Sequence, residues 1–435
     1  MNDMKKWSMI AAGLCIAACD GQHQKNRELA GLILGDTLMG RVEAMAREVV
    51  RGGFNAGDGY GEVWIRDLNT FVELAMEEVD DTLIRDNLLT FFRFQGEGGD
   101  MVDGFIDITC AVQRSDGYAY RYSDLEPRYA AHKNTVETDQ ESSLIQAVAR
   151  YVAKSGDTSL LGEQVGGRTV LQRIEHALEW LFNERYDRKY NLLWGATTVD
   201  WGDVQPEHSW GVAIDENSHL CLDIYDNAFF MIAIDCFLGL TDDQATQQRW
   251  SQVRENIRSH VRRHLWDSGR RKFIPHLYLA GSPFPAEFDE DAIYYHGGTA
   301  TAIEAGLLSE EEIACSYDAM KANVKAAGAQ TIGLTVYPPY PAGYFKNPGM
   351  HPYGYQNGGD WGWFGGRMVS QLVRYGFAFE AYEALTPMLE RVVANDGFYE
   401  WYSPEGVPSG SGSFRGEAGV LFKAISDLRE WAMGQ

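Results

Sequence analysis

The helical spacing of apolar residues limits most strongly what this chain can fold into. Twelve segments after residue 26 repeat apolar residues every three or four positions, which is the period of a helix with one buried face. These segments are 29–50, 68–79, 82–94, 142–153, 160–182, 220–237, 243–265, 297–305, 310–326, 361–375, 377–393 and 414–431. Because no charged run or low-complexity stretch divides them, we predict one all-α domain over 27–435.

The connections between these segments indicate how the helices are arranged. Short turns alternate with longer loops that are rich in glycine, aromatic and acidic residues. Twelve helices in alternating inner and outer layers would close as an (α/α)6 barrel of six helical hairpins, with a pocket formed by the loops at one end. The longest stretch without helical spacing, 96–138, predicts a small loop or β-hairpin insertion over that pocket.

The charge of the chain excludes one class of partner. The 435 residues include 38 Lys and Arg against 62 Asp and Glu, which gives a net charge of -24. So acidic a surface repels polyanions, and we therefore expect no nucleic acid partner. The 12 Trp, 22 Tyr and 20 Phe suit a large core or a cleft that stacks on flat apolar faces.

The N-terminal residues have the composition of an export signal. Two lysines, Lys5 and Lys6, precede the apolar run 7–18, which ends in small residues. That run is too short to span a membrane, so we predict a signal peptide over 1–18. No later segment reaches 18 uninterrupted apolar residues.

The cysteine that follows the small residues resembles the lipobox of bacterial lipoproteins. The resemblance implies that Cys19 becomes the lipidated first residue of the mature protein, with 19–26 as a tether. The protein would then be held in the bacterial cell envelope by its lipid, facing the periplasm. Asp20 resembles an inner-membrane retention signal. Ordinary signal cleavage beside an incidental cysteine is the alternative.

The remaining cysteines and three isolated histidines match no metal pattern. Four cysteines follow Cys19, and they are either free thiols or include one disulfide: Cys110, Cys221, Cys236 and Cys315. Isolated histidines such as His132, His208 and His296 form no pair four residues apart. We expect neither a metal nor an organic cofactor.

Five loop stretches place an acid or amide beside an aromatic ring. They are 64–67, 137–141, 200–203, 355–361 and 399–402. Sugars require this mixture, because their C–H faces stack on rings and their hydroxyls bind carboxylates, amides and guanidinium groups. Hydrolysis of a glycosidic bond needs two carboxyl groups, one that protonates the leaving oxygen and one that activates water or attacks carbon.

The order of these motifs resembles the six-hairpin (α/α)6 glycosidases, which include family 63 glucosidases, trehalases, glycogen-debranching glucosidases and glucoamylases. Residues 64–67 (Trp-Ile-Arg-Asp) look like the Trp-x-Arg-Asp that opens the second helix in several of these families. The resemblance implies that Arg66 and Asp67 hold sugar hydroxyls and that Trp64 walls the pocket. The alternative is a helix cap with a salt-bridged arginine.

Residues 355–363 form the most specific local match, to the Tyr-x-Asn-Gly-x-x-Trp-x-Trp segment of debranching and related enzymes. The resemblance implies substrate contacts for Gln356, Asn357, Asp360 and Trp361. Many relatives carry a neutral residue where this chain has Asp360. Asp360 would therefore bind substrate in a way particular to this protein, or cap the helix.

The sequence Phe-Tyr-Glu-Trp-Tyr around Glu400 resembles the end of family 63 glucosidases and trehalases, where the matching Glu is the general base. The resemblance makes Glu400 the base and Trp401 part of the pocket wall. Glu417 is the competing choice. It lies inside a predicted helix, where an ion pair with Arg415 or Lys423 would explain it.

The acid is expected in the middle of the chain. Residues Asp200, Trp201, Gly202 and Asp203 resemble the Asp-Trp-Asn-Asp loop of inverting sugar phosphorylases, whose final Asp donates the proton. Asp203 is therefore the predicted acid and Trp201 a wall residue. Asp200 is a neighbouring substrate contact or the alternative acid, since two close carboxyls raise one pKa. Asp139 precedes a helix, where relatives often carry an acidic substrate contact.

Together these motifs predict an exported, exo-acting hydrolase of α-linked gluco- or manno-configured oligosaccharides that inverts the anomeric centre. Three alternatives remain: an inverting sugar phosphorylase, a sugar epimerase or lyase, and a glycan-binding lipoprotein without activity. No glycine-rich phosphate cradle with Lys or Arg supports the first. The sugar, the linkage and the oligomeric state are open at this point.

Overall fold

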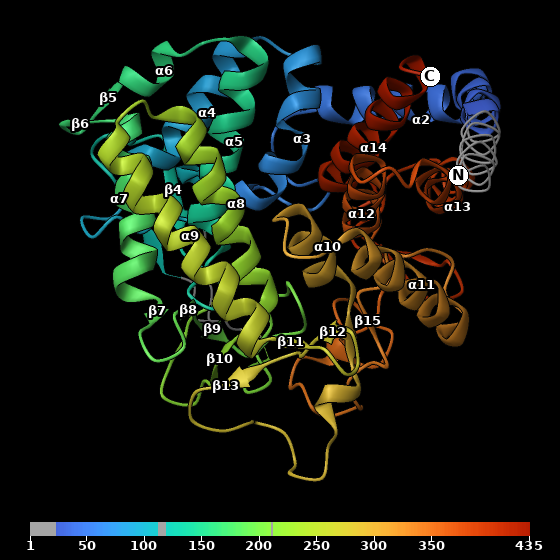
Figure 1. The fold of residues 1–435 in the computed structure, drawn as a ribbon. Helices are drawn as coiled ribbons and strands as arrows, with labels where there is room; N and C mark the ends of the chain where they lie inside the picture. The colour runs from blue at the N-terminus through green and yellow to red at the C-terminus, as the bar shows by residue number, and fades with distance from the viewer. Residues whose placement is uncertain (1–22, 112–118, 210–211) are drawn as a thin grey trace, which may run out of the picture.

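The computed structural model describes residues 23–111, 119–209 and 212–435 (Figure 1). The predicted signal peptide 1–18 and Cys19 lie outside these residues. Within them, no helix combines the length and apolar character that crossing a bilayer requires. The four cysteines of this region are free thiols, so none forms a disulfide there.

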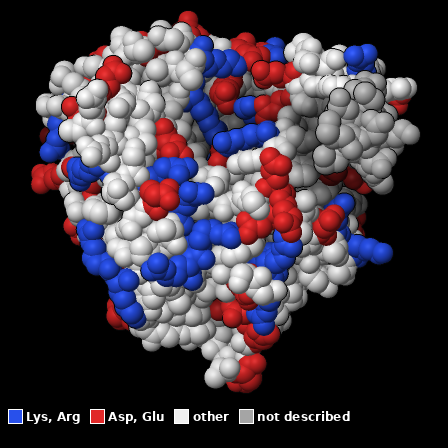
Figure 2. Space-filling model, viewed as in Figure 1, with Lys and Arg blue, Asp and Glu red and all other residues white. Residues whose placement is uncertain are grey.

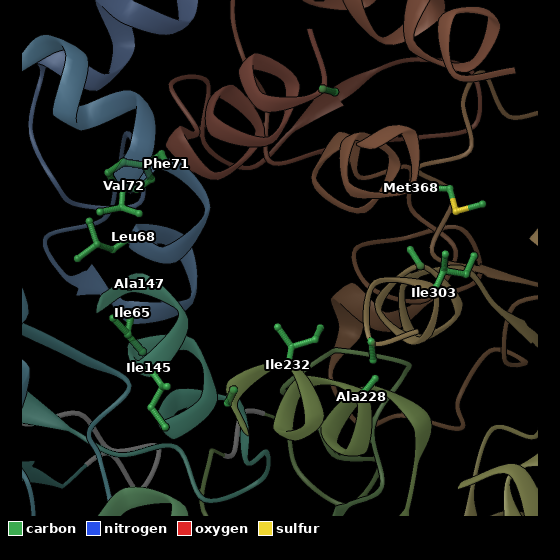
Figure 3. Packing of buried hydrophobic residues seen from close by; sticks show 14 of the residues in the cluster. Ile65, Leu68, Phe71, Val72, Ile145, Ala147, Ala228, Ile232, Ile303 and Met368 are labelled. Atoms are coloured by element: carbon green, nitrogen blue, oxygen red, sulfur yellow. The ribbon is translucent and has the colours of Figure 1, made fainter. Parts of the chain in front are cut away.

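An inner ring of helices forms the centre of the fold. In the described residues its members are α3 (Ile65–Glu78), α5 (Asp139–Ser155), α8 (Ile224–Leu240), α10 (His296–Glu304), α12 (Gly362–Arg374) and α14 (Arg415–Met433). Each packs on the next, and α14 packs on α3, which closes the ring. Figure 3 shows apolar side chains of these helices, including Leu68, Ile145, Ile232 and Met368, in the packing of this layer.

Each ring helix is preceded in the chain by an outer helix. The outer helices are α2 (Thr37–Arg51), α4 (Asp81–Arg93), α7 (Val170–Glu184), α9 (Gln244–His264), α11 (Glu310–Ala327) and α13 (Ala378–Ala394). Ring helix α8 is apolar along its whole length and buried on almost every side, as expected for a helix enclosed by neighbours. The predicted all-α (α/α)6 barrel is therefore confirmed.

Two predicted segments are each divided in the structure. Segment 29–50 is interrupted at Asp36, whose carboxylate caps α2, and residues 23–35 are a separate helix. Segment 160–182 contains α6 (Ser159–Gly162) and then a tight hairpin before α7. Gly166 and Gly167 make that turn with φ of 54° and 84°, in the left-handed region that favours glycine.

The predicted insertion is a small antiparallel sheet. Its strands are β1 (Val63–Trp64), β2 (Gly104–Asp107), β4 (Tyr129–His132) and β3 (Tyr120–Arg121), in that spatial order. Trp64 pairs with Gly104, and Gly104 pairs with His132. The sheet therefore joins the insertion to the first turn of α3.

Short strands and turns fill the remaining loops. The three-stranded sheet has β9 (Gly195–Ala196), β10 (Leu220–Leu222) and β13 (Leu277–Tyr278). The two-stranded pairs are β5 (Gln164–Val165) with β6 (Arg168–Thr169), β7 (Tyr186–Asp187) with β8 (Leu192–Leu193), β11 (Trp266–Asp267) with β12 (Lys272–Phe273), β14 (Tyr294–Tyr295) with β15 (Val336–Tyr337), and β16 (Trp401–Tyr402) with β17 (Pro408–Ser409). The 3-10 helices are η1 (Ile108–Cys110), η2 (Glu290–Ala292) and η3 (Pro348–Met350).

The ring helices all point the same way. The first turns of α3 and α5 meet through Arg66 and Asp139, and the first turn of α8 joins them through Tyr225. At the opposite end Arg367 and Arg374 of α12 contact Glu304, the last residue of α10. One end of the barrel therefore collects the helix N-termini with their loops, and the other collects the C-termini.

Candidate active site

Arg66 joins three segments at the N-terminal end of the ring. Its Nη1 lies 3.2 Å from Asp139 Oδ2, and its Nη2 lies 3.6 Å from Asp203 Oδ2. The Tyr225 hydroxyl donates to the same Asp139 oxygen at 3.0 Å. A guanidinium between two carboxylates holds them in fixed positions. The structure thus brings together Arg66, Asp139 and Asp203, which are widely separated in the sequence.

The Asp203 carboxylate reaches open space. Gln356 Nε2 donates to Asp203 Oδ1 at 3.0 Å, and 23% of the aspartate side chain is exposed. A Cβ at Gly202 would lie 2.5 Å from Gln356 Oε1, so a larger residue would displace the amide that orients Asp203. This contact explains why Gly202 stands where the resembling loop has asparagine.

Glu400 is held by hydrogen-bond donors at both carboxylate oxygens. The Tyr60 hydroxyl donates to Oε1 at 2.9 Å, and the Ser411 backbone N–H donates to Oε2 at 3.2 Å. Burial raises the pKa of Glu400; the two donors oppose that rise, and the charge of Asp203 adds to it. A Cβ at Gly410, which has φ of 71°, would lie 2.3 Å from Glu400 Oε2. Glycine is therefore required beside this carboxylate.

Asp203 and Glu400 act electrostatically on the same neighbours. Tyr355 is partly buried, and burial raises the pKa of its hydroxyl, with further contributions from Asp203 and Glu400. The pKa of Tyr60 is raised by burial and by the same two carboxylates. The two predicted catalytic carboxyls therefore belong to one site.

Sequence reasoning missed Tyr60 and Tyr355 as members of this site. Tyr60 stands alone in a glycine-rich loop, and no local pattern connects it with Glu400. Tyr355 belongs to the recognised 355–363 motif, but its side chain was not singled out. Its ring centroid lies 6.4 Å from that of Trp401 and 5.4 Å from that of Trp361. Only the contact with Glu400 across the barrel identifies the role of Tyr60.

Asp67 lies next to Arg66 and faces α14. Burial raises the pKa of Asp67 to about 7; the Arg66 charge lowers it, and the Glu400 charge raises it. A Cβ at Gly416 would lie 3.1 Å from Asp67 Oδ1, so a glycine in the first turn of α14 allows this approach. Asp67 is thus close enough to Glu400 for the two carboxyls to interact electrostatically, as Asp203 and Glu400 do.

The predicted tryptophan wall divides into two groups. Trp201 and Trp361 are almost fully buried, and their ring centroids lie 4.7 Å apart in an edge-to-face contact beneath the site. Trp64 and Trp401 are only partly buried and pack at the edge of this cluster. Trp64 and Trp401 therefore keep ring surface open, whereas Trp201 and Trp361 support the floor.

Asp200 has a structural position. Its Oδ2 accepts from Gly297 N–H and its Oδ1 from Gly298 N–H, both at 2.7 Å, at the N-terminus of α10. Burial raises the pKa of Asp200 to about 8, although the two backbone donors oppose the rise. Because both oxygens are engaged inside the protein, Asp203 is the carboxyl of this loop that reaches open space.

Asn357 and Asp360 also point into the protein. The amide of Asn357 donates to Tyr340 O and to Met350 O, both at 3.0 Å. Asp360 accepts from Thr331 Oγ1 at 2.6 Å and pairs with Arg391 at 2.9 Å. Of the polar side chains expected to bind substrate in this motif, the structure brings Gln356 to Asp203 and leaves Asn357 and Asp360 in the framework.

Glu417 is completely buried in α14. Its Oε1 lies 3.4 Å from Nη2 of Arg391, so its partner is neither Arg415 nor Lys423, the two basic residues considered from the sequence. Burial raises the pKa of Glu417 to about 7, and the Arg391 charge opposes the rise. With no access to open space, Glu417 is in no position to activate a water molecule.

A group of carboxyls is buried under Arg66. Glu137 accepts from Thr198 Oγ1 at 3.3 Å, and burial raises its pKa, with contributions from the charges of Asp139 and Asp226. Asp226 accepts from Thr138 N–H at 3.1 Å. Burial also raises the pKa of Asp226, so the surroundings favour the neutral form of both carboxyls beneath the site.

Comparison with known proteins supports the fold. No protein-family model matches the chain, and no curated protein does. The structure resembles the GH63 mannosylglycerate hydrolase of Thermus thermophilus, solved with glucose, with a TM-score of 0.62 at 16% identity over 88% of this chain and 99% of that one.

Two rhamnosidases are also similar. The GH78 rhamnosidase of Bacillus sp. GL1 aligns with a TM-score of 0.58 at 13% identity over 89% of this chain and 34% of that one. The rhamnosidase of Klebsiella oxytoca, solved with rhamnose bound, gives 0.57 at 12% identity over 89% and 63%. The chain therefore has the fold of the six-hairpin (α/α)6 glycosidases.

Proposed function

We propose that the protein is an exo-acting glycoside hydrolase that inverts the anomeric centre, with Asp203 as general acid and Glu400 as general base. The observation that carries the proposal is the meeting of these two carboxyls, from distant loops, around Tyr60, Tyr355 and Arg66. The fold shared with three glycosidases supports a glycosidic substrate.

The surroundings of Glu400 support its role as the base. Both of its oxygens accept hydrogen bonds, which favours the ionised form in spite of burial. In the proposed step Glu400 takes a proton from water, and the water oxygen bonds to the anomeric carbon. The bond from that carbon to the leaving oxygen breaks, and Asp203 gives its proton to the leaving oxygen. Inverting enzymes separate the two carboxyls by about 6.5–9.5 Å to admit the water.

The neighbouring side chains suit the sugar that loses its bond. Arg66, Asp67 and Asp139 supply charged partners for hydroxyls, and Gln356 supplies an amide. Trp64 and Trp401 supply partly open ring surface for the C–H faces of the sugar. In this proposal the sugar lies between the two rings, with its reacting bond between Asp203 and Glu400.

The substrate class is proposed as α-linked gluco- or manno-configured oligosaccharides. A screen of α- and β-linked disaccharides tests it, and mannosylglycerate and an α-rhamnoside extend the panel because similar structures belong to a mannosylglycerate hydrolase and to rhamnosidases. Each compound is incubated with and without phosphate. If turnover requires phosphate, the reaction is phosphorolysis and the proposed hydrolysis is wrong.

We also propose export and a lipid anchor on Cys19, with the catalytic domain facing the periplasm. Asn26, seven positions after Cys19, donates to Gln435 Oε1 at 3.1 Å, and Gln435 lies at the C-terminal end of the ring helices. A lipid at Cys19 would then hold the end of the barrel opposite to Asp203 and Glu400. The candidate active site would face away from the membrane.

A further inference from the structure

The C-terminal end of the ring contains a second cavity, remote from the candidate active site. Its volume is about 630 Å³, within the range of small-molecule sites. Figure 2 shows this end hollowed at the centre, with basic and acidic side chains around the hollow. Its wall includes Arg150, Glu304, Arg367, Ser370, Gln371 and Trp431, from four ring helices.

Glu304 organises the arginines of this cavity. Its Oε2 accepts from Arg367 Nε and Nη2 at 3.2 and 2.7 Å, and its Oε1 lies 3.8 Å from Arg150 Nη2. Arg374 donates to the backbone oxygen of Glu304 at 3.0 Å. These contacts hold the guanidinium groups at the last turn of α10.

Two buried side chains of the wall keep donors that the protein does not use. Arg367 and Gln371 are 6% and 8% exposed, so both are more than nine-tenths buried. Among the residues that the structure describes, Arg367 Nη1 and Gln371 Nε2 donate to no protein acceptor. Neither nitrogen is completely buried, so both are accessible from the cavity and can donate to a ligand or to water there.

The charges of the wall indicate the kind of partner. The basic residues are Arg150, Arg367, Arg374 and Lys423, and the acidic residues are Glu73, Glu304, Asp427 and Glu430. These charges balance. An anion would meet Glu73, Glu304 and the negative ends of the ring helices, and a cation would meet the arginines. The wall therefore favours a neutral ligand that both donates and accepts hydrogen bonds.

We propose that this cavity is a binding site for a neutral sugar or polyol. Hydroxyl groups can accept from Arg367 Nη1 and Gln371 Nε2 and donate to the carboxylate of Glu73. Trp431 and Val420 supply apolar wall for the C–H groups. The site is separate from Asp203 and Glu400, and its existence does not depend on the proposed catalytic function.

Isothermal titration calorimetry of the full chain with glucose and with glycerol tests the site, with sulfate as the anionic comparison. Gln371→Leu removes the unused amide, and Ser370→Phe fills the cavity. Gln248→Leu is the matched control, because Gln248 is exposed on the outer helix α9 and does not line the cavity. Melting temperatures establish that each variant is folded.

The expected result is binding of glucose or glycerol that weakens at least about tenfold in Gln371→Leu and in Ser370→Phe and persists in Gln248→Leu. Three results would overturn the site: neither compound binds the wild type, both cavity variants bind as the wild type does, or sulfate alone binds. Because the experiment measures binding, it tests the cavity even if the protein has no hydrolase activity.

Discussion

Tyr60 controls the charge of Glu400 more directly than any other side chain in the site, because its hydroxyl donates to Glu400 Oε1. This hydrogen bond lowers the pKa of Glu400 against the larger effect of burial. In Tyr60→Phe the pKa of Glu400 therefore rises. A base must be deprotonated, so the acid limb of kcat/KM should move to higher pH, and the rate at neutral pH should fall about tenfold or more.

The pH profile of kcat/KM for wild type and Tyr60→Phe checks this expectation. Tyr122→Phe is a suitable control, since Tyr122 is 62% exposed. If Tyr60→Phe lowers the rate equally at every pH, Tyr60 does not act through the ionisation of Glu400.

Asp200 should matter for stability. Asp200→Ala leaves the buried N–H groups of Gly297 and Gly298 without their acceptors, and we expect the free energy of unfolding to fall by about 2 kcal/mol. Asp200→Asn keeps one acceptor oxygen, so its free energy of unfolding should fall less than that of Asp200→Ala. Urea unfolding of the wild type, Asp200→Asn and Asp200→Ala measures this order of stability. Equal stability of wild type and Asp200→Ala would remove the capping role.

The kinds of residue in the candidate site could be predicted from the sequence, but the directions in which their side chains point could not. Short motifs predicted Arg66, Asp203 and Glu400 because sugar chemistry needs those groups beside aromatic rings, and the structure brings the three to the same end of the barrel. The same motifs also included Asn357 and Asp360, whose side chains turn into the framework. Local sequence does not reveal which way a loop side chain points, since distant segments supply its partners.

At the scale of elements, a buried ion network joins α12, α13 and α14. Arg391 of α13 pairs with Asp360 at 2.9 Å and with Glu417 at 3.4 Å, and its guanidinium lies 3.7 Å from the centroid of Tyr402. Asp360 and Tyr402 exchange backbone hydrogen bonds at 2.9 Å. The network therefore supports strand β16, which directly follows Glu400.

Removing Arg391 leaves two buried carboxyls without their cation. We expect Arg391→Met to lower the free energy of unfolding by about 3–5 kcal/mol, while Arg258→Met on the surface of α9 changes it by less than about 0.5 kcal/mol. Chemical unfolding of both variants at pH 7 measures the difference. A loss in Arg391→Met no larger than in Arg258→Met would contradict the account.

The pH dependence of this variant follows from Glu417. Its folded pKa, about 7, lies above the unfolded value, so its stabilising contribution is present at low pH and is lost as pH rises through 7. The charge of Arg391 lowers the pKa of Glu417, so the pKa of Glu417 should be higher in Arg391→Met than in the wild type. The loss in free energy of unfolding of Arg391→Met relative to the wild type should therefore be smaller at pH 5 than at pH 8.

Helices were predicted well from the sequence because their apolar period is local. All twelve predicted segments correspond to helices of the barrel. A cap or a glycine turn divides 29–50 and 160–182, and 220–237 begins in strand β10 rather than in α8. Strand β1 could not be predicted, since its two residues form a strand only by pairing with β2, far along the chain.

At the scale of the whole molecule, closing the ring places the two proposed sites at opposite ends of the barrel. The N-terminal ends of the ring helices gather Arg66, Asp203 and Glu400, and the C-terminal ends enclose the second cavity close to both chain termini of the described residues (Figure 1). Such a molecule can be held at one end and act at the other.

The proposed anchor gives a prediction for the intact protein. Cys19→Ser should remove the lipid site and move the protein from the membrane fraction to the soluble periplasmic fraction, with its Tm unchanged. Metabolic labelling with a radioactive fatty acid, followed by fractionation, measures both effects. Cys110→Ser is the matched control. Membrane association that survives Cys19→Ser without label would exclude this anchor.

The proposed catalytic pair is tested most directly by proton NMR of the first product anomer, followed from the start of the reaction on a substrate from the screen. The account predicts that an α-linked substrate first yields the β-anomer. It also predicts that Asp203→Asn and Glu400→Gln each lower kcat by at least about a hundredfold while remaining folded. First release of the α-anomer, or wild-type turnover in Glu400→Gln, would contradict it.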